Sequence, residues 1–178
     1  ISSAVGKYNN MVTLEEGVDA SWAQVENVYQ RRADLIPNLV ATVKGVAEFE
    51  KETFTAVAEA RSKVSNVNLE GITNNPQAMQ QFQQSQGQLS GALSKLMVVV
   101  ERYPDLKANQ NFLDLQTQLE GTENRISVER NRFNKAAQGY NTIIRRFPGS
   151  IYAGMFGFDR KAYFEAEAGS EVAPAVEF

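Results

Sequence analysis

Hydrophobic residues recur every three or four positions along most of the chain, which is the spacing of a helix with one buried face. The most regular run follows Pro76, and its seam is Met79, Phe82, Gln86, Leu89, Leu93, Leu96, Val100 and Tyr103. Loop-forming residues interrupt the rhythm between positions 66 and 75, and Pro104 and Pro148 each follow a run directly. The pattern predicts helices over approximately residues 4–32, 35–65, 76–103 and 107–147.

The boundary between the first two predicted helices depends on Asp34 and Pro37. Asp34 can cap a new helix, and Pro37 would then lie in its first turn, where a missing N–H is tolerated. The alternative is one long helix kinked at Pro37. Of the two, we favour the break. Asn75 followed by Pro76 predicts a similar capped start for the third helix.

The first three predicted helices have about 28–31 residues each, or roughly 45 Å at the rise of an α-helix. Similar lengths, with one long loop and two tight ones between the helices, are typical of an all-α, long antiparallel up-and-down four-helix bundle with coiled-coil-like seams, here over residues 1–149. We expect residues 150–178 to form an irregular, aromatic C-terminal tail that is docked on the bundle. Contact of the tail with lipid headgroups is the weaker alternative, because four Glu and no Lys or Arg occur from Glu165 onward.

Composition narrows the chemistry of such a bundle. The chain has no Cys and no His among its 178 residues, which removes the usual thiolate and imidazole nucleophiles and metal ligands. Its 18 Lys and Arg against 21 Asp and Glu give a net charge of −3 without a basic cluster, so a nucleic-acid partner is not expected. We therefore expect neither an enzyme nor a metal or cofactor site.

Distinctive short motifs occur in order along almost the whole chain. They are Trp22–Asn27, Gln30–Val40, Arg102–Ala108, Glu120–Ile126, Tyr140–Asn141, Phe147–Pro148, Phe156–Phe158 and Tyr163–Ala166. In these motifs the chain resembles the bacterial LemA family. The resemblance implies a helical domain behind a single N-terminal transmembrane helix in the bacterial cell membrane, with no catalytic residues and an uncharacterised biochemical role. The chain begins with Ile1 and not with Met, and its first segment already predicts a helix, which agrees with the expectation of a preceding segment.

A bundle anchored in this way would bring two of the motifs together at the end far from the membrane. The turns at 33–36 and 103–106 would meet there, and their polar residues could recognise a partner protein. The candidate partner-binding residues are Arg31, Arg32, Asp34, Asn38, Tyr103 and Asp105. A purely structural role, with Asp34 as a helix cap and the arginines near helix ends, is the alternative.

Polar residues also interrupt the hydrophobic seams, and these candidate core positions are Arg61, Gln86, Thr122 and Glu129. They would either fix the register of the helices or line a small-molecule cavity, and an Arg61–Glu129 ion pair is conceivable. The sequence thus predicts a non-enzymatic, membrane-anchored scaffold or protein-interaction domain. The alternative is a small-ligand-binding bundle with a polar-lined core cavity.

Overall fold

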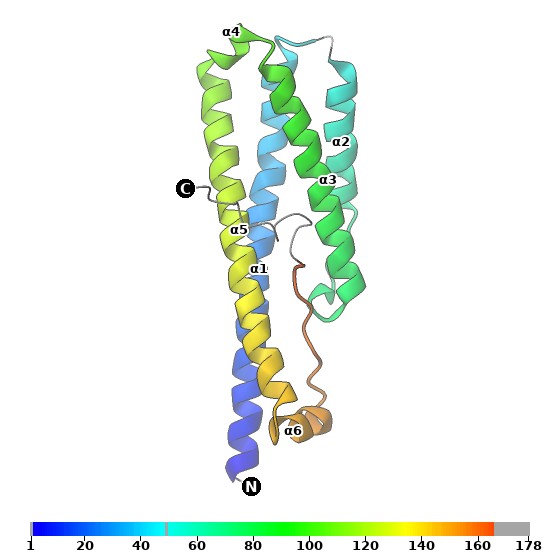
Figure 1. Cartoon of the computed structure of the whole chain (residues 1–178), viewed down its shortest axis with the longest axis vertical. Helices are drawn as coiled ribbons and strands as arrows, with labels where there is room; N and C mark the ends of the chain where they lie inside the picture. Colours follow the sequence, from blue (N-terminus) through cyan, green and yellow to red (C-terminus); the bar gives the residue numbers. More distant parts are fainter. Residues whose placement is uncertain (1, 49, 166–178) are drawn as a thin grey trace, which may run out of the picture.

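The computed structural model describes residues 2–48 and 50–165, and these residues form an all-α fold without a strand (Figure 1). The elements are α1 (Ser2–Lys44), α2 (Lys51–Ser65), a 3-10 turn η1 (Ile72–Asn74), α3 (Pro76–Val100), α4 (Pro104–Lys107), α5 (Gln110–Arg145) and α6 (Gly149–Phe156).

The long helices α1 and α5 lie side by side along the length of the molecule, whereas α2 and α3 pair beside their upper half (Figure 1). With 43 residues α1 is about 64 Å long, but α2 has only 15 residues and reaches about 22 Å. The expectation of matched helices is therefore wrong. Four helices lie together in the upper half, and α1 and α5 continue below as a two-helix stem that carries α6.

Helix α1 passes through Pro37 without interruption, so the expected break at Asp34 is wrong. Pro37 is exposed, while Ile36, Leu39 and Val43 around it are at most 2% exposed. These three residues form a buried stripe on both sides of the proline, and their burial keeps the helix continuous although Pro37 removes one backbone hydrogen bond. The Asp34 side chain caps nothing and accepts a hydrogen bond from the Gln30 amide at 2.8 Å.

The chain reverses direction after α1 instead, between Lys44 and Lys51. The later boundaries lie closer to their predicted positions. The Asn75 side chain accepts from the backbone N–H groups of Gln77 and Ala78, both at 3.1 Å, which confirms the predicted capped start of α3.

The core consists of two hydrophobic clusters stacked along the long axis. The upper cluster joins α1 to α2, α3, α4 and α5 through residues such as Leu39, Leu96 and Phe112. The lower cluster joins α1, α3 and α5 to the C-terminal region through residues such as Trp22 and Phe133. Between the clusters, the inward positions of α1, α3 and α5 are polar.

Part of the predicted irregular tail is helical, because α6 extends to Phe156, whereas residues 158–165 have no regular secondary structure. After α6, the segment 158–165, here called the strap, runs upward beside α5 and α3 (Figure 1). Phe164 is 4% exposed and stacks on Trp22 with ring centroids 5.9 Å apart. The strap therefore completes the lower cluster, whereas residues 166–178 of the predicted tail lie outside the described residues.

Candidate functional site

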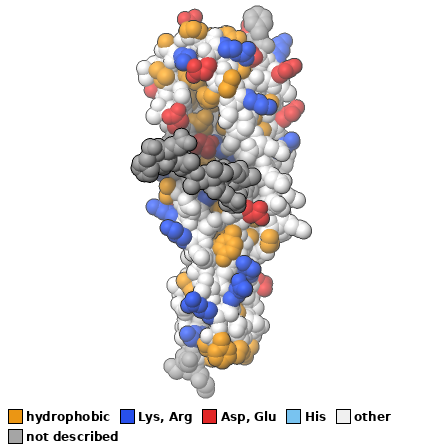
Figure 2. Space-filling model, viewed as in Figure 1, with side chains coloured by type: hydrophobic (Ala, Val, Ile, Leu, Met, Phe, Trp, Pro, Cys, Tyr) orange, Lys and Arg blue, Asp and Glu red, His pale blue; other side chains and the backbone are white. Residues whose placement is uncertain are grey.

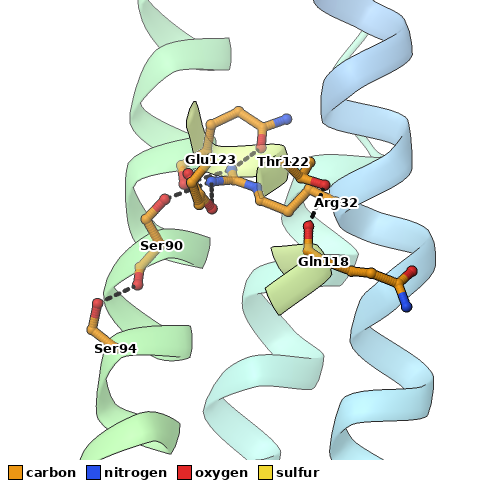
Figure 3. A network of polar contacts seen from close by, with 7 residues as sticks. Arg32, Ser90, Ser94, Gln118, Thr122 and Glu123 are labelled. Atoms are coloured by element: carbon orange, nitrogen blue, oxygen red, sulfur yellow. Dashed lines mark hydrogen bonds and ion pairs between the residues drawn. The ribbon is translucent and has the colours of Figure 1, made fainter. Parts of the chain in front are cut away.

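The polar layer between the two clusters is built around Arg32, which is 1% exposed (Figure 3). Its Nη1 donates to the Ser90 hydroxyl at 2.6 Å and to Glu123 Oε1 at 2.9 Å. Its Nη2 donates to the backbone and side-chain oxygens of Gln86. One side chain of α1 thus joins α3 and α5 in a single layer.

The electrostatics of this layer are asymmetric. The Arg32 side chain is 2% exposed, but the Glu123 side chain is 41% exposed and keeps contact with water. The Tyr29 ring lies 5.2 Å below the guanidinium and adds a cation–π contact, while Arg32 Nε makes no hydrogen bond. Buried charge of this kind needs several acceptors to offset its desolvation, so the layer specifies which helices lie together.

An open groove lies between α3 and α5 next to this layer, with a volume of about 540 Å³. Leu93, Met97 and Leu119 form its apolar floor, and Ser94 and Glu120 lie on its rim. Ser90 and Glu123 line it as well, so the groove adjoins the Arg32 layer.

A second group of polar contacts holds the strap by its backbone. Asn141 donates to the Lys161 carbonyl and accepts from the Lys161 N–H, both at 2.9 Å. Asn134 pairs with Phe164 in the same way, at 3.0 and 2.9 Å. Gln83 on α3 repeats the pairing with Glu165, at 2.8 and 3.1 Å. These three amides satisfy both polar groups of each residue that they hold.

A buried lysine that pairs with two partly exposed carboxylates fixes the lower half of the strap to α1. Lys161 is 4% exposed, and its Nζ lies 2.9 Å from Glu15 and 3.7 Å from Asp19. The same ammonium lies 5.6 Å from the ring of Tyr140. Burial, and then the charge of Glu15, raise the pKa of the Tyr140 phenol well above its ordinary value. The phenol therefore stays protonated to a higher pH than that of a free tyrosine.

The structure does not bring the six candidate partner-binding residues together. Arg31, Asp34 and Asn38 are exposed on α1, but Arg32 is buried in the polar layer. Because α1 continues for about 18 Å beyond Arg32 and about 9 Å beyond Asn38, these residues lie below the upper end of the molecule.

The other two candidates belong to α4, which lies at the upper end of the molecule (Figure 1): Tyr103 is its N-cap residue and Asp105 is in its first turn. Tyr103 donates to Glu50 at 3.4 Å, and Arg102 pairs with the same carboxylate at 3.2 Å. The expected meeting of two motifs is therefore replaced by contacts between α4 and the start of α2.

The four candidate core residues divide between core and surface. Gln86 and Thr122 are buried, and the Thr122 hydroxyl donates to the Gln118 carbonyl of its own helix at 2.8 Å. Arg61 is exposed, and Glu129 pairs with Arg132 at 2.9 Å, so the conceived Arg61–Glu129 pair is not formed. Two of the four thus contribute to the polar layer.

The role of the amides that hold the strap was not predicted from the sequence, although Asn141 stands in one of the family motifs. Asn134 and Asn141 lie seven residues apart on α5, each directly after a buried aromatic, Phe133 or Tyr140. Side chains two helical turns apart share a face, so this spacing was an available signal for a polar stripe beside the seam. Their partners lie 30 and 20 residues away, respectively, and no local pattern connects them.

Within residues 2–48 and 50–165, no three acidic side chains converge in a way that could hold a metal ion. Over the same residues, no helix combines the length and hydropathy that crossing a membrane requires.

Known proteins match this chain over nearly all of its length. Magnetosome protein MamQ 2 of Paramagnetospirillum magneticum is 29% identical over 182 residues, covering 93% of the chain and 67% of that protein. MamQ of Magnetospirillum gryphiswaldense is also 29% identical, with 92% and 66% covered. Protein LemA of Metamycoplasma hominis is 24% identical, with 91% and 70% covered. The LemA family model matches residues 21–178, and the chain therefore belongs to the LemA family.

Proposed function

We propose that this chain is a non-enzymatic scaffold domain that binds a partner protein and is anchored to the bacterial membrane by a helix N-terminal to it. Family membership and the magnetosome relatives support a place at a membrane. The chain spans about two thirds of the length of the MamQ relatives, which leaves room in such proteins for an anchor.

The observation that carries the proposed interaction is the groove between α3 and α5. Apolar side chains form its floor and carboxylates lie on its rim, which is the lining that an amphipathic helix with basic residues would complement. Val98 and Leu113, which are 66% and 39% exposed, lie one helical turn beyond the groove residues Ser94 and Gln116. They extend the apolar surface toward the upper end of the molecule.

Site-specific crosslinking in the native membrane tests this assignment. A photoreactive amino acid replaces the exposed Ser94 at the groove or, as the matched control, the exposed Ser62 on α2. We expect a discrete crosslinked protein from position 94 and none from position 62. The same products from both positions, or none from position 94, would contradict the proposal.

A charge-reversal pair then tests recognition rather than proximity. Glu120→Lys changes the rim of the groove, and Glu59→Lys changes an exposed carboxylate on α2. The crosslink from position 94 should be lost in the first variant and kept in the second, because only the first opposes a basic partner. Equal crosslinking in both variants would exclude recognition through this rim.

A ligand-binding function is the second candidate, because Arg61 and Gln86 both line a groove of about 420 Å³ beside α1, α2 and α3. The Gln86 side-chain oxygen already accepts a hydrogen bond from Arg32 within the protein, which favours a structural role for Gln86 over ligand binding. Mass spectrometry of the protein extracted from its membrane distinguishes ligand binding from the scaffold function. The native protein and the denatured protein are compared to find any small molecule that denaturation releases. A released small molecule that Arg61→Ala abolishes would favour ligand binding.

A further inference from the structure

The lower end of the molecule exposes an apolar patch around the start of α1. The end patch consists of Val5, Tyr8, Phe147, Ile151, Met155 and Phe156, which are 53, 41, 82, 52, 70 and 46% exposed. It comprises six of the eleven exposed large hydrophobic side chains of the described residues. Figure 2 shows hydrophobic side chains gathered at this end. A concentration of this kind marks an interaction surface.

Helix α6 presents its part of the patch, namely Ile151, Met155 and Phe156, in a fixed orientation. Gly149 at its start is buried, and a Cβ there would lie 2.2 Å from the Ile143 carbonyl oxygen, so α6 packs closely on the end of α5. Ala153 is buried on the same side, and Tyr8 on α1 contacts the Phe156 ring at 5.0 Å. Ile151 and Met155, spaced by four residues, consequently point outward together.

The charge at this end is opposite in sign to that of the whole chain. Residues 1–14 and 143–158 contain Lys7, Arg145 and Arg146 and no Asp or Glu, although the chain has a net charge of −3. All three basic side chains are exposed. An apolar surface with aromatic rings and a basic border matches the interface of an anionic lipid bilayer.

We propose that the end patch lies in the headgroup region of an anionic membrane and holds the molecule upright on it. Phe147, Ile151 and Met155 would enter the boundary of the acyl chains, while Arg145 and Arg146 would contact lipid phosphates. This inference deepens the membrane placement of the proposed function and makes no use of the groove between α3 and α5. That groove lies in the upper half of the molecule, away from the end patch (Figure 1).

Vesicle co-sedimentation of the 178-residue chain tests the proposal. We expect binding to phosphatidylcholine vesicles that contain about one third phosphatidylglycerol, with an affinity at least about tenfold above that for phosphatidylcholine alone. Added salt should weaken the binding, because it screens the basic residues. Absence of binding to the anionic vesicles would overturn the proposal.

Two pairs of variants assign the binding to the end patch. Ile151→Ser with Met155→Ser, and separately Arg145→Glu with Arg146→Glu, should each lower vesicle affinity about tenfold or more while leaving the helical circular dichroism unchanged. The matched controls are Val46→Ser with Val128→Ser and Arg31→Glu with Arg125→Glu, which change exposed residues elsewhere. Equal losses in patch and control variants would overturn the assignment.

A second copy of this chain is the competing occupant of the patch. Analytical ultracentrifugation without lipid tests this alternative. If the chain is a dimer that the Ile151 and Met155 substitutions dissociate, and if it does not bind vesicles, then the patch is a self-association surface and not a membrane-binding surface. Crosslinking at Ser94 is scored separately. If crosslinking fails but vesicle binding is intact, the proposed partner at the groove is wrong and the proposed role of the end patch stands. If crosslinking succeeds but vesicle binding is absent, only the proposed role of the end patch is wrong.

Discussion

At the residue scale, the decisive side chain is Arg32. Its guanidinium reaches two other helices from α1, and its ion-pair partner Glu123 remains partly hydrated. Removal of the cation would leave the buried Gln86 amide without its donor and open space in the layer, whereas Glu123 would keep water as a partner. The neighbouring Arg31 points to solvent, so the two adjacent arginines have opposite roles.

Arg32→Met should therefore lower the free energy of unfolding by about 2–3 kcal/mol, because buried hydrogen-bonding groups lose their partner. Arg31→Met is the matched control and should change it by less than about 0.5 kcal/mol. Urea denaturation followed by circular dichroism measures both values. Equal effects of the two substitutions would contradict the structural role assigned to Arg32.

A double-mutant cycle refines this prediction. Arg32→Met and Glu123→Gln should be coupled by about 1–2 kcal/mol, since the two side chains contact each other directly. Additivity within about 0.5 kcal/mol would show that the ion pair adds nothing beyond the neutral hydrogen bonds.

At the scale of the elements, α1 contains a proline that its buried stripe tolerates. Pro37 cannot donate to the Ala33 carbonyl, and its ring crowds that group, yet the helix continues to Lys44. Ile36, Leu39 and Val43 bury their side chains in the upper cluster on either side of the proline. The packing of a long helix thus outweighs a local preference for a break.

Pro37→Ala should raise the free energy of unfolding by about 2 kcal/mol. A proline inside a helix costs about 3 kcal/mol, and its stiffening of the unfolded chain returns up to about 1 kcal/mol. Asn38→Ala, at the next exposed position, should gain only about 0.5 kcal/mol or less. Thermal and urea unfolding measure the difference, and unchanged or lower stability in Pro37→Ala would show that Pro37 causes no strain in α1.

At the scale of the whole molecule, the strap connects the helix pairs. Asn134 and Asn141 hold it to α5, and Gln83 holds it to α3. Phe164 enters the lower cluster between these attachments and contacts Trp22, Phe82 and Phe133. The lower halves of α1, α3 and α5 therefore share their core with a segment from the far end of the sequence.

Phe164→Ala should lower the free energy of unfolding by about 3 kcal/mol, because it empties a buried site among aromatic rings. Trp22, the single tryptophan, should report the change by a red shift of its emission. Phe147→Ala removes a ring that is 82% exposed and should cost less than about 0.5 kcal/mol without shifting the emission. A Trp22 environment unaffected by Phe164→Ala would contradict docking of the strap.

The sequence by itself determined the helical class of this protein and part of its elements. Helical periodicity and propensity act over a few residues, so the seam of α3, its start at Asn75 and Pro76 and the all-α class were all predictable. Membership of the LemA family could also be predicted from the sequence, because the family's motifs occur in order along the chain. Each of these features depends on neighbours within a few helical turns or on the linear order of residues.

Only the tertiary structure decided where those elements contact one another. Asp34 and Pro37 predict a boundary locally, but burial of Ile36 and Leu39 against other helices removes it. Arg32 resembles a surface residue in the sequence, and it becomes a core residue because α3 supplies its acceptors 54 and 58 positions away. Long-range burial and pairing are sums over contacts between distant segments, and no periodicity within one segment contains them.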